Sequence, residues 1–168
     1  MLYLYLSSPA TWLSVLMPAL ICIWALTTSP LNRQQWKTFL VCTALSFVSA
    51  RWELKADVEQ LFIIPVMLVW LMVLLYRGDA WHGRQAFAVV FLSLWLVDMS
   101  KAALLHASGQ LSGPAFYWGV GGAGIKDGLA LFPSLAWLLT CYIDWRRPRP
   151  VSAETPNPAS TTILNNKP

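Results

Sequence analysis

The chain has 168 residues, of which 57% are hydrophobic and only 12% are charged, whereas about a quarter of the residues of a soluble domain are charged. Its mean hydropathy of +0.52 argues against a soluble domain, because a folded domain of about 150 residues still exposes roughly 30% of its chain surface to water. The net charge of +4 comes from basic residues at the ends of apolar runs rather than from a dense basic face, so we expect a lipid bilayer and not nucleic acid as the partner.

The apolar runs predict an all-α fold, a polytopic membrane helix bundle of about five transmembrane helices within residues 1–147. A hydrocarbon core about 30 Å thick takes about 20 helical residues, and the first charged residue is Arg33. Residues 1–10 lack the basic residues that begin a signal peptide, so we expect the first helix to be retained. The predicted spans are, in chain order, about residues 10–28, 36–54, 61–76, 86–105 and 124–143.

The second predicted span carries charge at both ends. Only 13 residues separate Lys37 from Arg51, so both side chains would have to snorkel to the membrane surface. Residues 51–59 alternate polar and apolar side chains, which by itself favours a strand. Because we see no partner strand, we expect a charged amphipathic extension of the helix at the outer surface, either as a docking surface for an extracytoplasmic partner or as a solvated connector. Four spans, without this helix, are the alternative.

The remaining spans differ in how well their residues suit a membrane. Leu61–Tyr76 is an uninterrupted apolar run, whereas the fourth span reaches membrane length only if it includes Asp98 and Lys101. The fifth ends in aromatic residues followed by arginines, a pattern typical of a membrane interface. Residues 148–168 are rich in Pro, Ser, Thr and Asn and predict a disordered cytoplasmic tail.

Basic residues are distributed unequally between the two sides of this five-span arrangement, and membrane proteins hold their Lys and Arg on the cytoplasmic side. We therefore expect a bacterial-type cytoplasmic (inner) membrane, with the amino terminus outside and the carboxyl terminus inside. The richer side holds Arg33, Lys37, Arg77, Arg84, Arg146, Arg147, Arg149 and Lys167, and the poorer side holds Arg51, Lys55, Lys101 and Lys126.

A candidate polar cluster lies in the outer half of the predicted bundle. Asp98 and Lys101 are three residues apart, so they share a helix face and can pair. Charged residues inside spans are costly and usually face the bundle interior; the alternative is that the pair marks the interface end of its helix. The other members of the cluster are His106, Lys126 and Asp127.

A glycine-rich segment, residues 119–124, matches the letters of a dinucleotide-binding motif. That motif requires a preceding strand and a following helix within a βαβ unit, which we do not expect here. We interpret the segment as a flexible or re-entrant connection, or as an anion contact for a lipid phosphate or a partner carboxylate. The candidate contact residues are Gly121, Gly122, Gly124 and Lys126.

No motif in the chain matches a hydrolase or a metalloenzyme, and the three cysteines, Cys22, Cys42 and Cys141, lie inside apolar runs without metal-ligand spacing. We expect neither a metal nor a cofactor and assign no catalytic residue. The leading hypothesis is a non-enzymatic multi-pass membrane protein that acts through helix and loop contacts with another membrane protein or with itself, as an assembly, accessory, exclusion or immunity factor. The alternatives are a small channel, pore or transporter subunit, and a membrane enzyme acting on lipid or a lipid-linked substrate.

Overall fold

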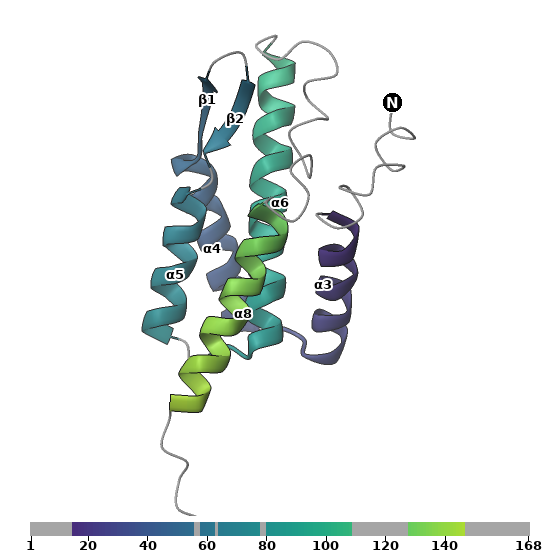
Figure 1. The fold of residues 1–168 in the computed structure, drawn as a ribbon, viewed down its shortest axis with the longest axis vertical. Coiled ribbons are helices and arrows are strands. Elements are labelled where there is room, and N and C mark those ends of the chain that lie inside the picture. The colour runs from purple at the N-terminus through teal and green to yellow at the C-terminus, as the bar shows by residue number, and fades with distance from the viewer. Residues whose placement is uncertain (1–14, 56–57, 63, 78–79, 109–127, 147–168) are drawn as a thin grey trace, which may run out of the picture.

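The computed structural model describes residues 15–55, 58–62, 64–77, 80–108 and 128–146. The side chains of residues 51–65, 102, 105 and 106 lie outside this description, as does the predicted tail. Within the described ranges the chain forms five α-helices and one hairpin of two strands (Figure 1). The elements are α3 (Met17–Thr28), α4 (Arg33–Ser49), β1 (Arg51–Lys55), β2 (Val58–Phe62), α5 (Ile64–Arg77), α6 (Gly83–Ala107) and α8 (Gly128–Arg146).

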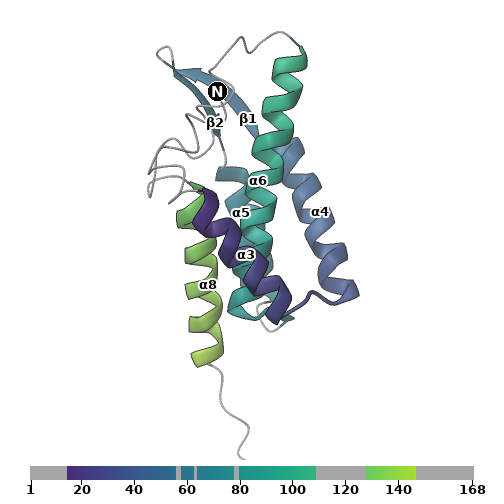
Figure 2. The same cartoon turned by 90° about the vertical axis from the view of Figure 1, so that its right-hand side faces the viewer.

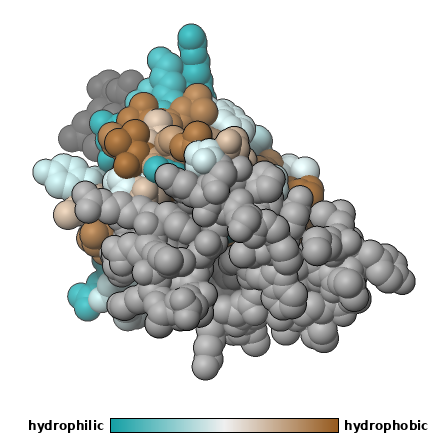
Figure 3. All heavy atoms as spheres, turned by 90° about the horizontal axis from the view of Figure 1, so that it is seen from above, coloured by the Kyte–Doolittle hydropathy of each residue, from teal (hydrophilic) through white to brown (hydrophobic). Residues whose placement is uncertain are grey.

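The helices run alternately up and down the long axis of the molecule (Figures 1 and 2). The carboxyl ends of α3, α5 and α8 and the amino ends of α4 and α6 meet at one end, which we call the basic end because α4 begins at Arg33, α5 ends at Arg77 and α8 ends at Arg146. The opposite end carries β1 and β2 and is called the hairpin end. Seen from there, hydrophilic and hydrophobic side chains lie side by side on the described surface (Figure 3).

Local sequence signals explain where α3 and α4 meet. Pro18 stands in the first turn of α3, where the missing amide hydrogen costs least, and Pro30 follows directly after the cap residue Ser29. Asn32 then caps α4: its side chain accepts a hydrogen bond from the backbone of Gln35, and the Gln35 side chain accepts one from the backbone of Asn32, both at 2.8 Å. This reciprocal capping box satisfies two amides that the helix leaves unpaired.

Helix α6 is the centre of the bundle. It packs against α3, α4, α5 and α8, and most extensively against α8. Every residue from Gln85 to Phe91 is buried, as expected for a helix whose apolar side chains cover all its faces and whose neighbours surround it. The partners on either side include Cys22, whose thiol donates to the Ala88 carbonyl at 3.7 Å, and Trp137, whose ring meets that of Phe87 edge-on at 6.1 Å.

Large apolar side chains also cover the outside of the molecule. Every helix contributes to this exposed set, and several members expose more than half of their surface. The exposed residues include Leu20, Ile23 and Trp24 of α3; Leu40, Val41, Leu45 and Val48 of α4; Leu68, Leu71, Met72 and Leu75 of α5; Trp95, Leu96 and Leu104 of α6; and Leu131, Leu135 and Leu138 of α8.

The hairpin corrects the prediction of a helical extension at residues 51–59. Arg51–Lys55 pairs antiparallel with Val58–Phe62, in a register that sets Arg51 opposite Phe62 and Lys55 opposite Val58. The period-two pattern of residues 51–59 was therefore the correct signal, and its partner strand lies immediately downstream. Consequently α4 ends at Ser49 instead of continuing to residue 54, and α5 begins at Ile64 because Leu61 and Phe62 belong to β2.

By length and composition, α8 is the one helix of the described ranges that is long and apolar enough to cross a membrane. The apolar helices α3 and α5 are shorter. At about 1.5 Å per residue, the 17 residues of α4 reach about 26 Å and the 25 residues of α6 reach about 37 Å.

Candidate functional site

A buried polar clasp, formed by the side chains of Gln35 and Gln85, joins four segments at the basic end. The Gln35 amide nitrogen donates to the side-chain oxygen of Gln85 at 3.0 Å and also to the backbone carbonyl of Ala80. The Gln85 amide nitrogen in turn donates to the carbonyl of Pro30 at 3.1 Å. Both glutamines are almost completely buried, with 6% and 5% of their surface exposed.

The clasp satisfies backbone groups that two loops would otherwise leave unpaired. The side-chain oxygen of Gln85 accepts from the His82 amide at 3.2 Å, and its nitrogen reaches the Ser29 carbonyl at 3.4 Å. Leaving a buried polar group without a partner costs about 1–3 kcal/mol. The pair therefore fixes the α3–α4 connection against the start of α6.

A second polar contact joins α4 and α6 halfway along their length. The hydroxyls of Thr43 and Ser93 lie 2.7 Å apart, and each residue stands ten positions after the first residue of its helix, about 15 Å along the axis. Ser46 lies one turn beyond Thr43 and is fully buried, and no described residue forms a hydrogen bond with its hydroxyl.

Lys101, a member of the predicted polar cluster, makes a third contact between α4 and α6, after the Gln35–Gln85 and Thr43–Ser93 contacts. Its ammonium group lies over the ring of Phe47, 4.5 Å from the centroid, a cation–π contact. Asp98, one turn earlier on α6, is half-buried and interacts with another group of the protein. The predicted pairing of Asp98 with Lys101 stays a prediction.

The other predicted site residues fall outside the description. Lys126 and Asp127 are outside the described ranges, as are the predicted anion contacts Gly121, Gly122 and Gly124, and the side chain of His106 is also not described. Asp98 and Lys101 are therefore the members of the candidate cluster for which the structure supplies an environment. The described ranges hold no group of three or more His, Cys, Asp and Glu residues that could bind a metal ion.

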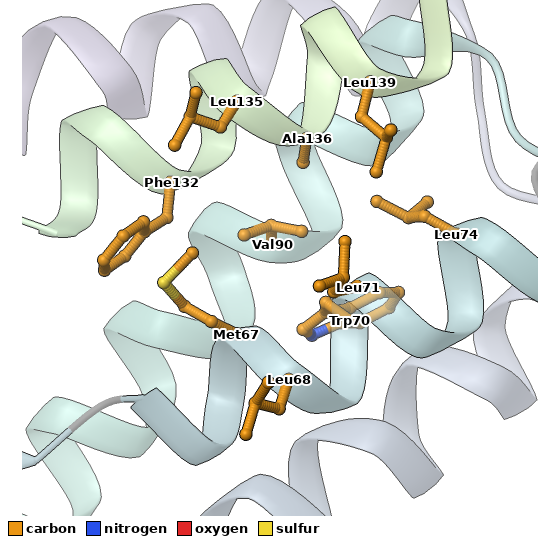
Figure 4. Close-up of a pocket in the computed structure, with 10 residues that line it drawn as sticks. All are labelled: Met67, Leu68, Trp70, Leu71, Leu74, Val90, Phe132, Leu135, Ala136 and Leu139. Atoms are coloured by element: carbon orange, nitrogen blue, oxygen red, sulfur yellow. The ribbon is translucent and has the colours of Figure 1, made fainter. Parts of the chain in front are cut away.

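An apolar groove of about 420 Å³ lies between α5 and α8. Val90 of α6 contributes to its lining (Figure 4), and nearly all of the lining surface is apolar. This volume falls within the range of about 300–1,000 Å³ that small-molecule sites occupy. The lining residues are Met67, Leu68, Trp70, Leu71, Leu74, Val90, Phe132, Leu135, Ala136 and Leu139.

Trp70 is the polar exception in this lining. Its side chain is 1% exposed and its ring meets that of Trp81 edge-on at 5.8 Å. The indole N–H has no hydrogen-bond partner in the described part of the chain, although a buried indole usually finds one.

Sequence reasoning missed both the groove and the clasp. Trp70 stands inside an uninterrupted apolar run, so nothing in the sequence separates it from the exposed apolar residues beside it. For the clasp a signal did exist: Asn32 and Gln35 have the spacing of a capping box, and glutamine is rarely found at buried positions without a partner.

Comparisons with known proteins identify no relative of this chain. Models of known protein families give no match, and neither the curated proteins nor the solved structures give one.

Proposed function

We propose that this chain is a multi-pass protein of a bacterial-type inner membrane that acts without catalysis, as an assembly or accessory factor for another membrane protein. Its helices cross the bilayer, its basic end faces the cytoplasm, and the hairpin faces outward. Its working surfaces are the outward faces of its helices and the hairpin.

The observation that carries this proposal is the exposure of large apolar side chains on every helix. Leu138 is 65% exposed, Met72 65% and Val48 79%. Burying one such side chain fully is worth about 1.5–3 kcal/mol, so a surface made of many of them favours hydrocarbon over water. Soluble monomers rarely expose a contiguous apolar patch larger than a few hundred Å².

Element lengths and charge are consistent with the same location. The Thr43–Ser93 contact, about 15 Å from the basic end, would lie near the middle of a 30 Å hydrocarbon core. Lys101 stands 18 residues after Gly83, about 27 Å along α6, and would approach the far interface. Among the described residues, the basic end carries five basic side chains against one acidic side chain, Asp144 of α8; the basic residues are Arg33, Lys37, Arg77, Arg84 and Arg146.

Membrane extraction followed by gentle purification tests the proposal. We expect the chain to stay with the membrane after alkaline carbonate washing, to require detergent for release, and to co-purify with one specific membrane protein. Release by carbonate would refute the membrane location. A chain that purifies alone from mild detergent would refute the accessory role while leaving the location intact.

A small channel is the second candidate, and the polar α4–α6 interface favours it. Gln35 with Gln85, Thr43 with Ser93, and Lys101 with Phe47 place polar groups at three levels of one interface, and Asp98 lies on α6 between the second and third levels. Between membrane helices such groups also act as interhelical hydrogen bonds, worth about 0.6 kcal/mol on average. Flux through reconstituted vesicles separates the two roles: a channel loses or changes flux in Asp98→Asn, whereas vesicles that show no flux with the unmodified protein remove this candidate.

A further inference from the structure

We propose that the groove between α5 and α8 binds one acyl chain of an anionic phospholipid, whose phosphate is held by the arginines at the basic end. This inference rests on the membrane location proposed above. It adds to that location a defined lipid site on one side of the bundle.

The size and lining of the groove select a single chain rather than a helix. The lining residues run from Met67 to Leu74 on α5 and from Phe132 to Leu139 on α8, which is about two turns, or about 10.5 Å, of each helix. A partner helix that crosses the bilayer is about 30 Å long, so most of its length would lie outside the groove. The short, apolar groove suits part of one narrow, flexible acyl chain.

Arginines stand beyond the groove on both of the helices that form it. Arg77 lies three residues after Leu74, about 4.5 Å further along α5, and Arg146 lies seven residues after Leu139, about 10.5 Å further along α8. Both helices end at the basic end (Figure 1). A phosphate at this end of the groove would therefore meet positive charge from both walls. The Arg146 Nε donates to the Tyr142 hydroxyl at 2.8 Å, so its two terminal nitrogens are the donors for a phosphate, whose geometry an arginine fork matches.

Trp70 supplies an independent sign of a polar contact in an otherwise apolar site. Its indole N–H is buried and has no partner among the described residues, and its ring lies among the lining side chains (Figure 4). The indole nitrogen has almost no exposed surface, so an ester or carbonyl oxygen of a bound lipid would accept this hydrogen bond after the Trp70 ring turns toward the groove. A hydrocarbon chain alone would fill the groove but leave the donor unpaired.

Native mass spectrometry of the full chain in mild detergent, titrated with phosphatidylglycerol or with phosphatidylcholine, tests the site. We expect one tightly bound phosphatidylglycerol and at least tenfold weaker retention of phosphatidylcholine. Leu135→Trp fills the groove from α8 and should weaken phosphatidylglycerol binding at least tenfold. Its matched control is Leu138→Trp, on the same helix but outside the lining, which should bind as the unmodified chain does.

Two further variants separate the headgroup from the chain. Arg77→Gln with Arg146→Gln should remove the preference for phosphatidylglycerol, whereas Arg33→Gln at the same end should retain it. Trp70→Phe keeps an aromatic ring but removes the donor, and we expect binding to weaken by about fivefold, the equivalent of roughly 1 kcal/mol.

Several outcomes would overturn the proposal. Equal binding by Leu135→Trp and Leu138→Trp would place the lipid elsewhere, and equal retention of the two lipids would reduce it to nonspecific surface lipid. Loss of a co-purifying protein in Leu135→Trp, with lipid binding unchanged, would make the groove a protein contact. All of these results leave the carbonate extraction unaffected, so failure of the lipid site is distinguishable from failure of the membrane location.

Discussion

Gly83, the first residue of α6, shows how closely this helix approaches α8. A β-carbon at this position would meet the indole ring of Trp137 and would stand 3.1 Å from the Cys141 sulfur. The ring cannot simply move aside, because it packs edge-on against Phe87 on the same helix as Gly83. The absence of a side chain at residue 83 is therefore a condition for the α6–α8 contact.

We expect Gly83→Ala to lower the free energy of unfolding by about 1–3 kcal/mol, the usual cost of overpacking. Reversible unfolding in detergent micelles measures this change. Repeating the substitution in a Trp137→Leu background should remove most of the loss, since the obstructing ring is then gone. An equal loss in both backgrounds would show that Trp137 is not the obstacle.

At the scale of elements, the clasp at the basic end holds α4 and α6 to the loops that precede them. We expect Gln35→Ala to lower the free energy of unfolding by about 2 kcal/mol, because the Asn32 amide and the Ala80 carbonyl lose their partner and the Gln85 oxygen loses one of its donors. The neighbouring Gln34→Ala, at an exposed position of the same turn, should cost less than about 0.5 kcal/mol. Thermal unfolding of the two variants in the same detergent provides the comparison.

The hairpin shows which element the sequence could not place. The alternation in residues 51–59 indicated a strand, but the partner strand begins at Val58 and continues into Leu61 and Phe62, the first residues of the apolar run that we predicted as a helix. A short strand and the first turn of an apolar helix have the same composition, so periodicity alone cannot separate them. Pairing decides, because each strand satisfies the backbone groups of the other.

For the whole molecule, the prediction of a helical fold is confirmed: five helices occupy the described ranges. That they form a multi-pass membrane bundle stays a prediction, since α8 is the one helix in the described part of the chain that meets the length and composition of a span. How the helices pack against one another could not be predicted from the sequence. The clasp, the groove and the central position of α6 depend on which residues of different helices meet, and this chain contains no repeat or motif that encodes those pairings.

Single-cysteine labelling tests the orientation of the whole molecule. With Cys22, Cys42 and Cys141 replaced by alanine, Lys55→Cys at the hairpin end should react with a membrane-impermeant maleimide added outside intact cells. Arg33→Cys at the basic end should react only after the membrane is opened. The reverse pattern would invert the orientation, and labelling of both from outside would contradict a bundle that crosses the membrane.

The central position of α6 also constrains how the protein can be made. Synthesis proceeds from the amino terminus, so α3, α4, the hairpin and α5 all emerge before α6, against which α3 packs most extensively and α4 packs as extensively as it does against α5. The Gln35 side chain and the carbonyls of Ser29 and Pro30 likewise gain their hydrogen bonds to Gln85 only after residue 85 has been made. In a nascent chain halted before residue 83, α4 would already have α5 as a neighbour, whereas α3 would lack its main packing partner. The arrangement of the first half of the molecule is therefore completed only when α6 has been made.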